Sequence, residues 1–73
     1  MATPLLATTL VRADHVRSFH VRVGRPAGWE AAEHEDQRVV QQQHYSDWHR
    51  VEQALVRFAR DIAALRKEGW HEA

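Results

Sequence analysis

Residues 46–70 read SDWHRVEQALVRFARDIAALRKEGW, and this stretch decides the fold because it encodes one long amphipathic helix. Its large apolar side chains recur at spacings of three and four residues, which places them on the face of a helix that packs against a core. These side chains are Trp48, Val51, Leu55, Phe58, Ile62 and Leu65. The same spacing would suit the seam of a helix dimer, but packing on a sheet is the better interpretation for so short a run.

Both ends of this helix carry recognisable signals. Ser46 is a suitable N-cap, and Asp47 lies where a negative charge interacts favourably with the helix dipole. Gly69 is suited to the left-handed residue that ends many helices, and Trp70 is placed to fold back onto the last turn. The sequence therefore predicts a helix over residues 47–68.

Upstream of the helix the apolar period changes to two. Residues 18–23 alternate polar and apolar side chains, as in a half-buried strand, and a glycine- and proline-containing turn follows. A register that places Val23 opposite Trp29 gathers apolar residues on one face and pairs Arg22 with Glu30 on the other. This agreement predicts a β-hairpin.

The rest of the chain gives weaker strand signals. A turn near residues 35–37 precedes a predicted third strand over 38–45, where the glutamines at 41–43 fit an edge strand or one exposed to a partner. Residues 1–15 are predicted to form a flexible arm or an extra strand. The expected fold is α+β, with a small antiparallel sheet of two or three strands packed against one long C-terminal helix in a single domain over 16–73.

Composition excludes several classes of protein. The 73 residues include no cysteine, so neither a disulfide framework nor a thiolate metal site is expected. The N-terminus lacks a basic start, and Pro4 interrupts its apolar run, which argues against a secretory signal. No stretch has the length of a membrane-spanning helix. We therefore expect a cytoplasmic protein with no membrane partner.

Catalytic and metal-binding patterns are weak. The six histidines include no pair one helical turn apart, so we expect no metal site, although a metal-dependent fold remains an alternative. The chain has no cysteine nucleophile and no glycine-rich phosphate loop, and Ser46 is already explained as a cap. We expect a protein that is not an enzyme and needs no cofactor.

Charge is segregated along the chain although the formal net charge is zero. Residues 1–28 carry four arginines and one aspartate, or +3, whereas residues 29–36 carry four acidic residues, or −4. These patches either neutralise each other across a hairpin or steer a partner. Because tryptophan and arginine anchor many interfaces, the predicted protein-binding residues are Arg17, His20, Arg22, Arg25 and Trp29.

The helix offers an alternative site. Its back face carries a basic stripe that would either contact phosphates or remain a solvated face with an Arg57–Asp61 pair. The candidate nucleic-acid-binding residues are Arg50, Arg57, Arg60 and Lys67. A homodimer through the helix flank of Val56, Ala59 and Ala63 is compatible with either function.

In size and layout, the chain resembles the small phage-encoded proteins that bind and reprogramme host RNA polymerase. The resemblance rests on a short cysteine-free chain with a small sheet, one helix and segregated charge. It implies a protein partner, no cofactor, and inhibition or redirection of transcription in the host cytoplasm. Direct nucleic-acid binding is the second hypothesis.

Overall fold

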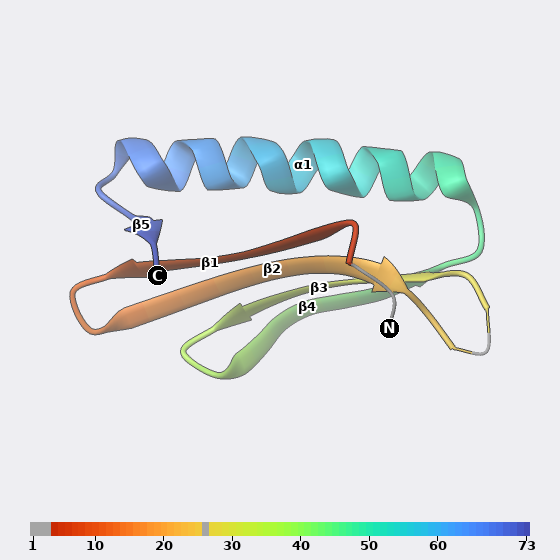
Figure 1. Ribbon diagram of the computed structural model, residues 1–73, viewed down its shortest axis with the longest axis horizontal. Coiled ribbons are helices and arrows are strands. Elements are labelled where there is room, and N and C mark those ends of the chain that lie inside the picture. The colour runs from red at the N-terminus through yellow and green to blue at the C-terminus, as the bar shows by residue number, and fades with distance from the viewer. Residues whose placement is uncertain (1–3, 26) are drawn as a thin grey trace.

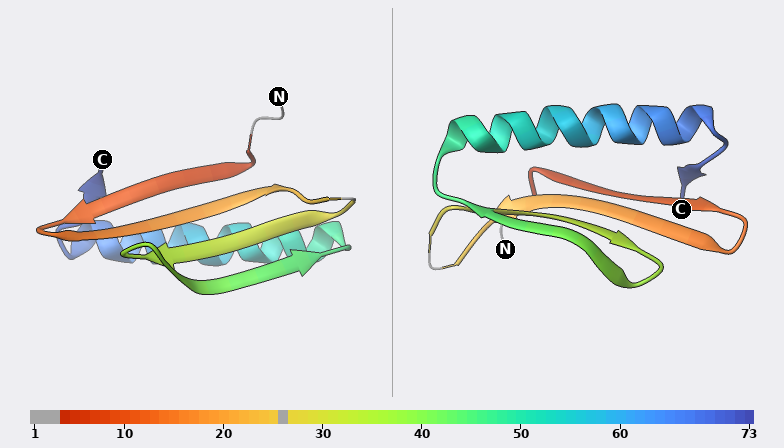
Figure 2. Two further views of the ribbon diagram at one scale, coloured as in Figure 1. Left: turned by 90° about the horizontal axis from the view of Figure 1, so that it is seen from below. Right: turned by 180° about the vertical axis from the view of Figure 1, so that it is seen from behind.

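The computed structural model describes residues 4–25 and 27–73, which form an antiparallel sheet with one helix across a single face (Figures 1 and 2). The elements are β1 (Leu6–Arg12), β2 (His15–Val23), β3 (Trp29–Glu35), β4 (Arg38–Tyr45), α1 (Trp48–Lys67) and β5 (His71–Glu72). The strand order is β4-β3-β2-β1-β5, so the first four strands form a meander and the last returns beside the first.

The five-stranded sheet shows that the predicted sheet of two or three strands was wrong. Within the segment 1–15, β1 pairs with β2 along its whole length, from Leu6 opposite Val21 to Arg12 opposite His15. Its polar threonines obscure the apolar alternation in the sequence. Two residues are too few to give β5 any periodic signal. Residues 1–3 of the predicted arm lie outside the described residues.

The predicted hairpin register is confirmed, because Val23 lies opposite Trp29 and Arg22 opposite Glu30. The predicted third strand is β4, with the expected bounds. It follows a two-residue turn in which Asp36 and Gln37 have φ angles of 50° and 71°. Positive φ at both central residues is the geometry that matches the twist of a tight hairpin.

The N-terminus of α1 differs from the prediction in two respects. The N-cap is Asp47 rather than Ser46, since the Asp47 side chain accepts a hydrogen bond of 3.0 Å from the backbone N–H of His49. Trp48, which was predicted to lie in the core, is 44% exposed.

No helix in residues 4–25 and 27–73 is long and apolar enough to cross a membrane.

The C-terminus of α1 closes as predicted. Gly69 has a φ angle of 100°, and the N–H of Trp70 donates a 3.0 Å hydrogen bond to the carbonyl of Leu65. The Gly69 N–H donates to the carbonyl of Arg66 at 3.2 Å. This pair of bonds is the Schellman arrangement, and it directs the half-buried Trp70 onto the core.

The core lies between α1 and one face of β1, β2 and β3. Phe19 and Phe58 meet edge to face at its centre, with ring centroids 5.2 Å apart. The buried apolar cluster consists of Leu10, Phe19, Val21, Ala31, Val51, Ala54, Phe58, Ile62 and Leu65. Alternate residues of the strands therefore point toward the helix, and the intervening residues point to the opposite face of the sheet.

Candidate protein-binding surface

The predicted protein-binding residues do not share one surface. Arg17 and Trp29 lie on the helix-facing side of the sheet, as their cross-strand neighbours Leu10 and Val23 do. His20, one position from the core residue Phe19, points to the opposite side. Arg22 likewise follows the core residue Val21 and shares the face of His20, whereas the exposed Arg25 lies in the turn between β2 and β3. The structure therefore brings together His20 and Arg22, and separates the other three residues from them.

Arg17 is engaged within the fold. Its guanidinium pairs with the carboxylate of Glu33, and the two side chains are 24% and 8% exposed. The same guanidinium carbon lies 5.7 Å from the centre of the Phe19 ring. An arginine held between a buried carboxylate and a core aromatic ring supports the fold and has little freedom to contact a partner.

Trp29 also belongs to the packing beneath the helix. It is half-buried against the core, and its ring lies 5.4 Å from that of Trp48 at the start of α1. This contact between aromatic rings ties the beginning of β3 to the first turn of the helix.

The uncovered side of the sheet is a surface that the charge pattern alone did not reveal. The helix packs on the other side, so alternate residues of β1 to β4 form what we call the open face. Its members are Ala7, Thr9, Val11, Val16, Ser18, His20, Arg22, Glu30, Ala32, His34, Val39, Gln42 and His44. Alternate residues within 30–34 and 42–44 belong to this face, but the sequence assigns them to it only when the register of the strands is known.

The centre of the open face is built around two imidazoles. The rings of His20 and His34 are stacked with centroids 5.8 Å apart, above the buried Ala32. Burial lowers the pKa of His20, and the nearby positive charge of Arg22 lowers it further. The guanidinium of Arg22 lies 4.0 Å from the carboxylate of Glu30. The positive charge of Arg22 is therefore accompanied on this face by the negative charge of Glu30.

One end of the open face is fixed by the turn between β2 and β3. The imidazole of His44 lies 2.8 Å from the carbonyl oxygen of Ala27. Gly28 has a φ angle of 80°, and an added Cβ would lie 2.5 Å from the carbonyl oxygen of Tyr45. Since a side chain would collide there, glycine permits the turn to pack against the end of β4.

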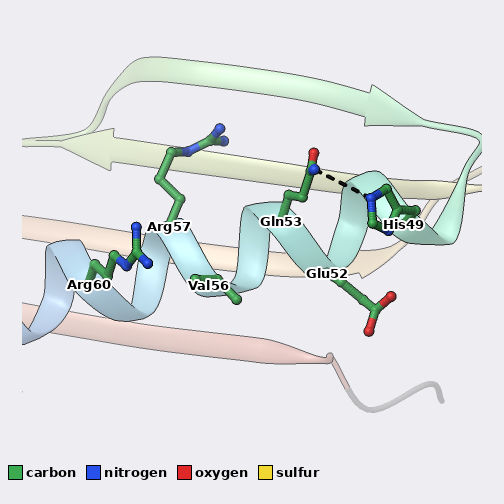
Figure 3. A pocket seen from close by; sticks show the side chains of 6 residues that line it. All are labelled: His49, Glu52, Gln53, Val56, Arg57 and Arg60. Atoms are coloured by element: carbon green, nitrogen blue, oxygen red, sulfur yellow. Dashed lines mark hydrogen bonds between the residues drawn. The ribbon is translucent and has the colours of Figure 1, made fainter.

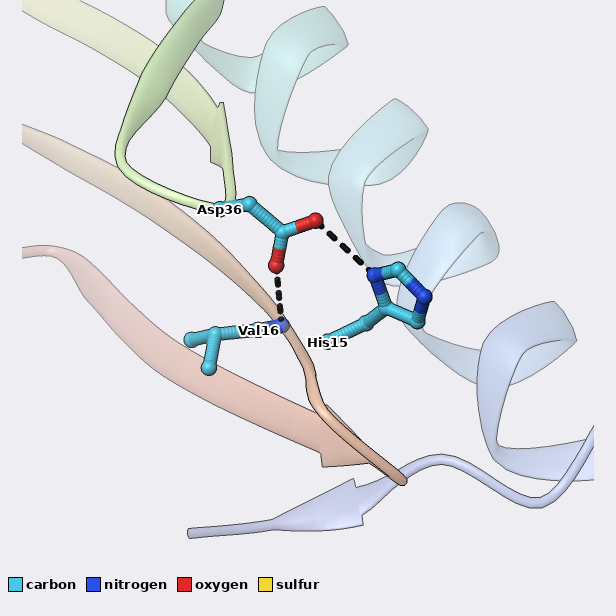
Figure 4. Close-up of polar contacts among 3 residues, drawn as sticks. All are labelled: His15, Val16 and Asp36. Atoms are coloured by element: carbon cyan, nitrogen blue, oxygen red, sulfur yellow. Dashed lines mark hydrogen bonds and ion pairs between the residues drawn. The ribbon is translucent and has the colours of Figure 1, made fainter.

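At the other end, a polar contact links two hairpin turns (Figure 4). One carboxylate oxygen of Asp36 accepts a 2.8 Å hydrogen bond from the N–H of Val16, and the other lies 2.9 Å from His15 Nδ1. The hydrogen bond to Asp36 raises the pKa of His15. The same bond, aided by that from Val16, lowers the pKa of Asp36.

The four basic residues predicted to bind nucleic acid are all exposed on α1, but they do not form a single row. Arg57 and Gln53 point toward the β4 side of the helix, whereas Arg60 lies on its outer surface (Figure 3). Arg50 lines a shallow hollow with Arg57 and Tyr45, near the junction of β4 and α1. Lys67 follows at the C-terminal end of the helix. Among the described residues, none of these four cations forms an ion pair.

The hollows along α1 are surface depressions rather than an enclosed site. One is lined by His49, Val56 and Arg60 together with neighbouring helix residues (Figure 3). The other combines Tyr45 and Asp47 with four helix residues, His49, Arg50, Gln53 and Arg57. Because the lining residues stand on the convex outside of a helix, a small ligand would remain largely in contact with solvent. In the part of the chain that the structure describes, no three histidine, aspartate or glutamate side chains gather as a metal site would require.

No protein-family model, no curated protein and no solved structure matches the chain. The resemblance to phage regulators of RNA polymerase therefore stays a prediction.

Proposed function

We propose that this domain is a protein-binding regulator that uses the open face of its sheet. The observation that supports this proposal is a broad strand surface of β1 to β4 with the helix entirely on the other side. It combines exposed valines, such as Val16 at 40% and Val39 at 56%, with the stacked imidazoles of His20 and His34. A mixed apolar and polar surface of this kind has the composition of many protein interfaces.

Electrostatics favour a protein over a nucleic acid on the open face. Arg22 is its arginine, and Glu30 lies beside it, so the face presents little net positive charge. Phosphate binding depends on several uncompensated cations, which this face does not offer. The target class that fits the resemblance is bacterial RNA polymerase in the cytoplasm, with inhibition or redirection of transcription as the effect.

The test is affinity capture from nuclease-treated bacterial lysate, with two matched variants. Val16→Asp places a charge on the open face, whereas Val56→Asp makes the same change on the outer surface of α1, where Val56 is 52% exposed. We expect RNA polymerase subunits to be captured by the wild-type protein and by Val56→Asp, and to be lost with Val16→Asp. Circular dichroism checks that both variants are folded. Equal capture of polymerase by both variants would show that the open face is not the binding surface.

Nucleic-acid binding through α1 is the second candidate, because Arg50, Arg57, Arg60 and Lys67 are exposed and have no described acidic partner. If these residues contact phosphates, binding to a labelled DNA must weaken steeply as salt rises, with a slope that decreases when Arg60 and Lys67 become alanine. Binding that is independent of salt would exclude this function.

A further inference from the structure

Strand β4 forms one outer edge of the sheet, and no described residue pairs with its outer side. The opposite edge differs, because β5 covers part of β1 there. An edge strand presents a row of backbone N–H and C=O groups that can accept another strand. β4 is eight residues long and largely exposed, so its edge is accessible along its length.

The regular part of this edge is short and carries no acidic residue. Gln41 lies opposite Glu33 and Val39 opposite His34, so Val40 is an extra, bulged residue. A bulge disrupts the ladder and bends the strand, which discourages pairing at that point. The five residues from Gln41 to Tyr45 remain in regular register and could form hydrogen bonds with an added strand.

The helix places positive charge beside this regular segment. Arg57 points toward the β4 side of α1, and Arg50 lines the hollow that also includes Tyr45. Asp47 also lines that hollow, but its carboxylate already accepts the N-cap hydrogen bond from His49. Gln41, Gln43 and Tyr45 share the helix-facing side of the sheet with Glu33, Ala31 and Trp29. Helix-facing side chains of a further strand would therefore lie on the side of the sheet where Arg50 and Arg57 approach β4.

This charge distribution selects the occupant of the edge. Two copies of β4 paired with each other would bring the Arg50 and Arg57 sides of both helices toward one another, and like charges oppose such an arrangement. A segment with acidic side chains at every second position could instead form backbone hydrogen bonds with β4 and direct its carboxylates toward the two arginines.

We propose that β4 accepts an extended acidic segment of a partner protein as a sixth strand, with its acidic side chains directed toward Arg50 and Arg57. This proposal rests on the protein-binding function above and specifies the partner's binding segment. The partner strand would hydrogen-bond to Gln41–Tyr45, and the arginines would select its charge.

The probe is a fluorescent seven-residue peptide in which glutamate alternates with threonine. A peptide of the same composition with its glutamates in consecutive positions is the control for net charge, and the corresponding lysine peptide is the control for sign. We expect the alternating peptide to bind most tightly by fluorescence anisotropy, and the lysine peptide to show no binding. Equal binding of the alternating and block peptides would overturn strand addition, because only the pleat of a strand distinguishes them.

A matched pair of helix variants tests the charge argument. Arg57→Glu and Arg60→Glu change the net charge equally on the same helix, but only Arg57 points toward β4. We expect Arg57→Glu to weaken peptide binding about tenfold, which corresponds to about 1.4 kcal/mol, and Arg60→Glu to change it less than about twofold. Equal effects of the two variants would contradict docking at the β4 edge.

Amide hydrogen exchange provides the backbone measurement and needs no variant. Because successive N–H groups in an edge strand point alternately inward and outward, bound peptide should slow exchange at alternate residues within Gln41–Tyr45. Unchanged exchange there would overturn the proposal.

If the peptide fails to bind while RNA polymerase capture remains sensitive to Val16→Asp, the edge proposal alone is wrong. If the peptide binds but capture fails, the regulator proposal is wrong and the edge site stands.

Discussion

Glu33 is buried at 6% exposure, and its charge is compensated by Arg17 on the neighbouring strand. The two positions are not directly opposite, because Phe19 faces Glu33 and Arg17 faces Glu35. Arginine reaches diagonally to the buried carboxylate, while the more exposed Glu35 remains in contact with solvent. The charge of Arg17 therefore compensates the buried Glu33 carboxylate, a pairing that the order of residues along the chain does not reveal.

We expect Arg17→Met to destabilise the protein by about 3 kcal/mol, since it leaves a buried carboxylate without its partner. Urea unfolding measures this change as a loss in the free energy of unfolding. The double variant Arg17→Met/Glu33→Met should be more stable than Arg17→Met alone, because it removes the orphaned charge. A cost below about 1 kcal/mol for the single variant would show that water or another group compensates Glu33.

The His15–Asp36 contact should make stability depend on pH (Figure 4). The pKa of His15 is raised above 6.5, so its contribution is fully present below pH 6.5 and is lost as pH rises through the folded-state pKa. The pKa of Asp36 is lowered below 3.8, so its contribution is present above pH 3.8 and is lost as pH falls through the folded-state pKa. The contact therefore stabilises the fold most between pH 3.8 and 6.5.

Melting temperatures of the wild-type protein and His15→Ala at pH 5 and pH 8 test this expectation. The difference between the two proteins should be larger at pH 5. Comparing the difference removes the opposite contribution of His20, whose lowered pKa reduces stability as pH falls below 6.5. A difference that is larger at pH 8 would contradict the assignment.

The elements differ in how far the sequence predicts them. Helix α1 and the β2–β3 register were predictable because their apolar periods, 3.6 and 2, extend over many residues. The sequence predicts β1 only as one of two alternatives, because threonines occupy two of its seven positions. β5 exists only through its pairing with Leu10 and Val11, about sixty residues earlier in the chain, and no local pattern encodes such a contact.

Ser46 and Asp47 are adjacent candidates for the N-cap of α1, and Asp47 occupies this position. We expect Asp47→Ala to cost about 1 kcal/mol of stability, because it removes the acceptor for the His49 N–H. Ser46→Ala, one residue earlier, should have little effect. Thermal unfolding of the two variants measures both costs, and a larger loss for Ser46→Ala would restore the original N-cap prediction.

The whole domain depends on one thin layer of apolar contacts between α1 and the sheet. Phe58→Ala should destabilise it by about 3 kcal/mol or more, because the cavity adds to the lost burial of a ring that is 0% exposed. Val56→Ala, two residues away on the exposed side, should stay within about 0.5 kcal/mol of the wild-type protein. Circular dichroism during urea unfolding measures the stability of both variants. Similar losses of stability would contradict an orientation of α1 in which Phe58 faces the sheet and Val56 faces solvent.

The candidate site was less predictable than the fold because a surface depends on which way each side chain points. The sequence grouped Arg17, His20, Arg22, Arg25 and Trp29 by proximity along the chain, but a strand sends neighbours to opposite faces. It likewise joined Arg57 and Arg60 into one stripe, whereas the structure directs only Arg57 toward β4. The strand register, rather than charge or composition, assigned the residues to surfaces.

The return of β5 to β1 has a consequence for protein synthesis. Glu72 pairs with Leu10, so 62 further residues (72 − 10) must be translated before this pair can form. At about 5–20 residues per second, translation of these residues takes roughly 3–12 seconds, during which β5 cannot pair with β1. During this interval β1 is open to neighbouring chains or to chaperones, and pairing with residues 71–73 then closes part of it, with the N–H of Ala73 bonded to the carbonyl of Thr9.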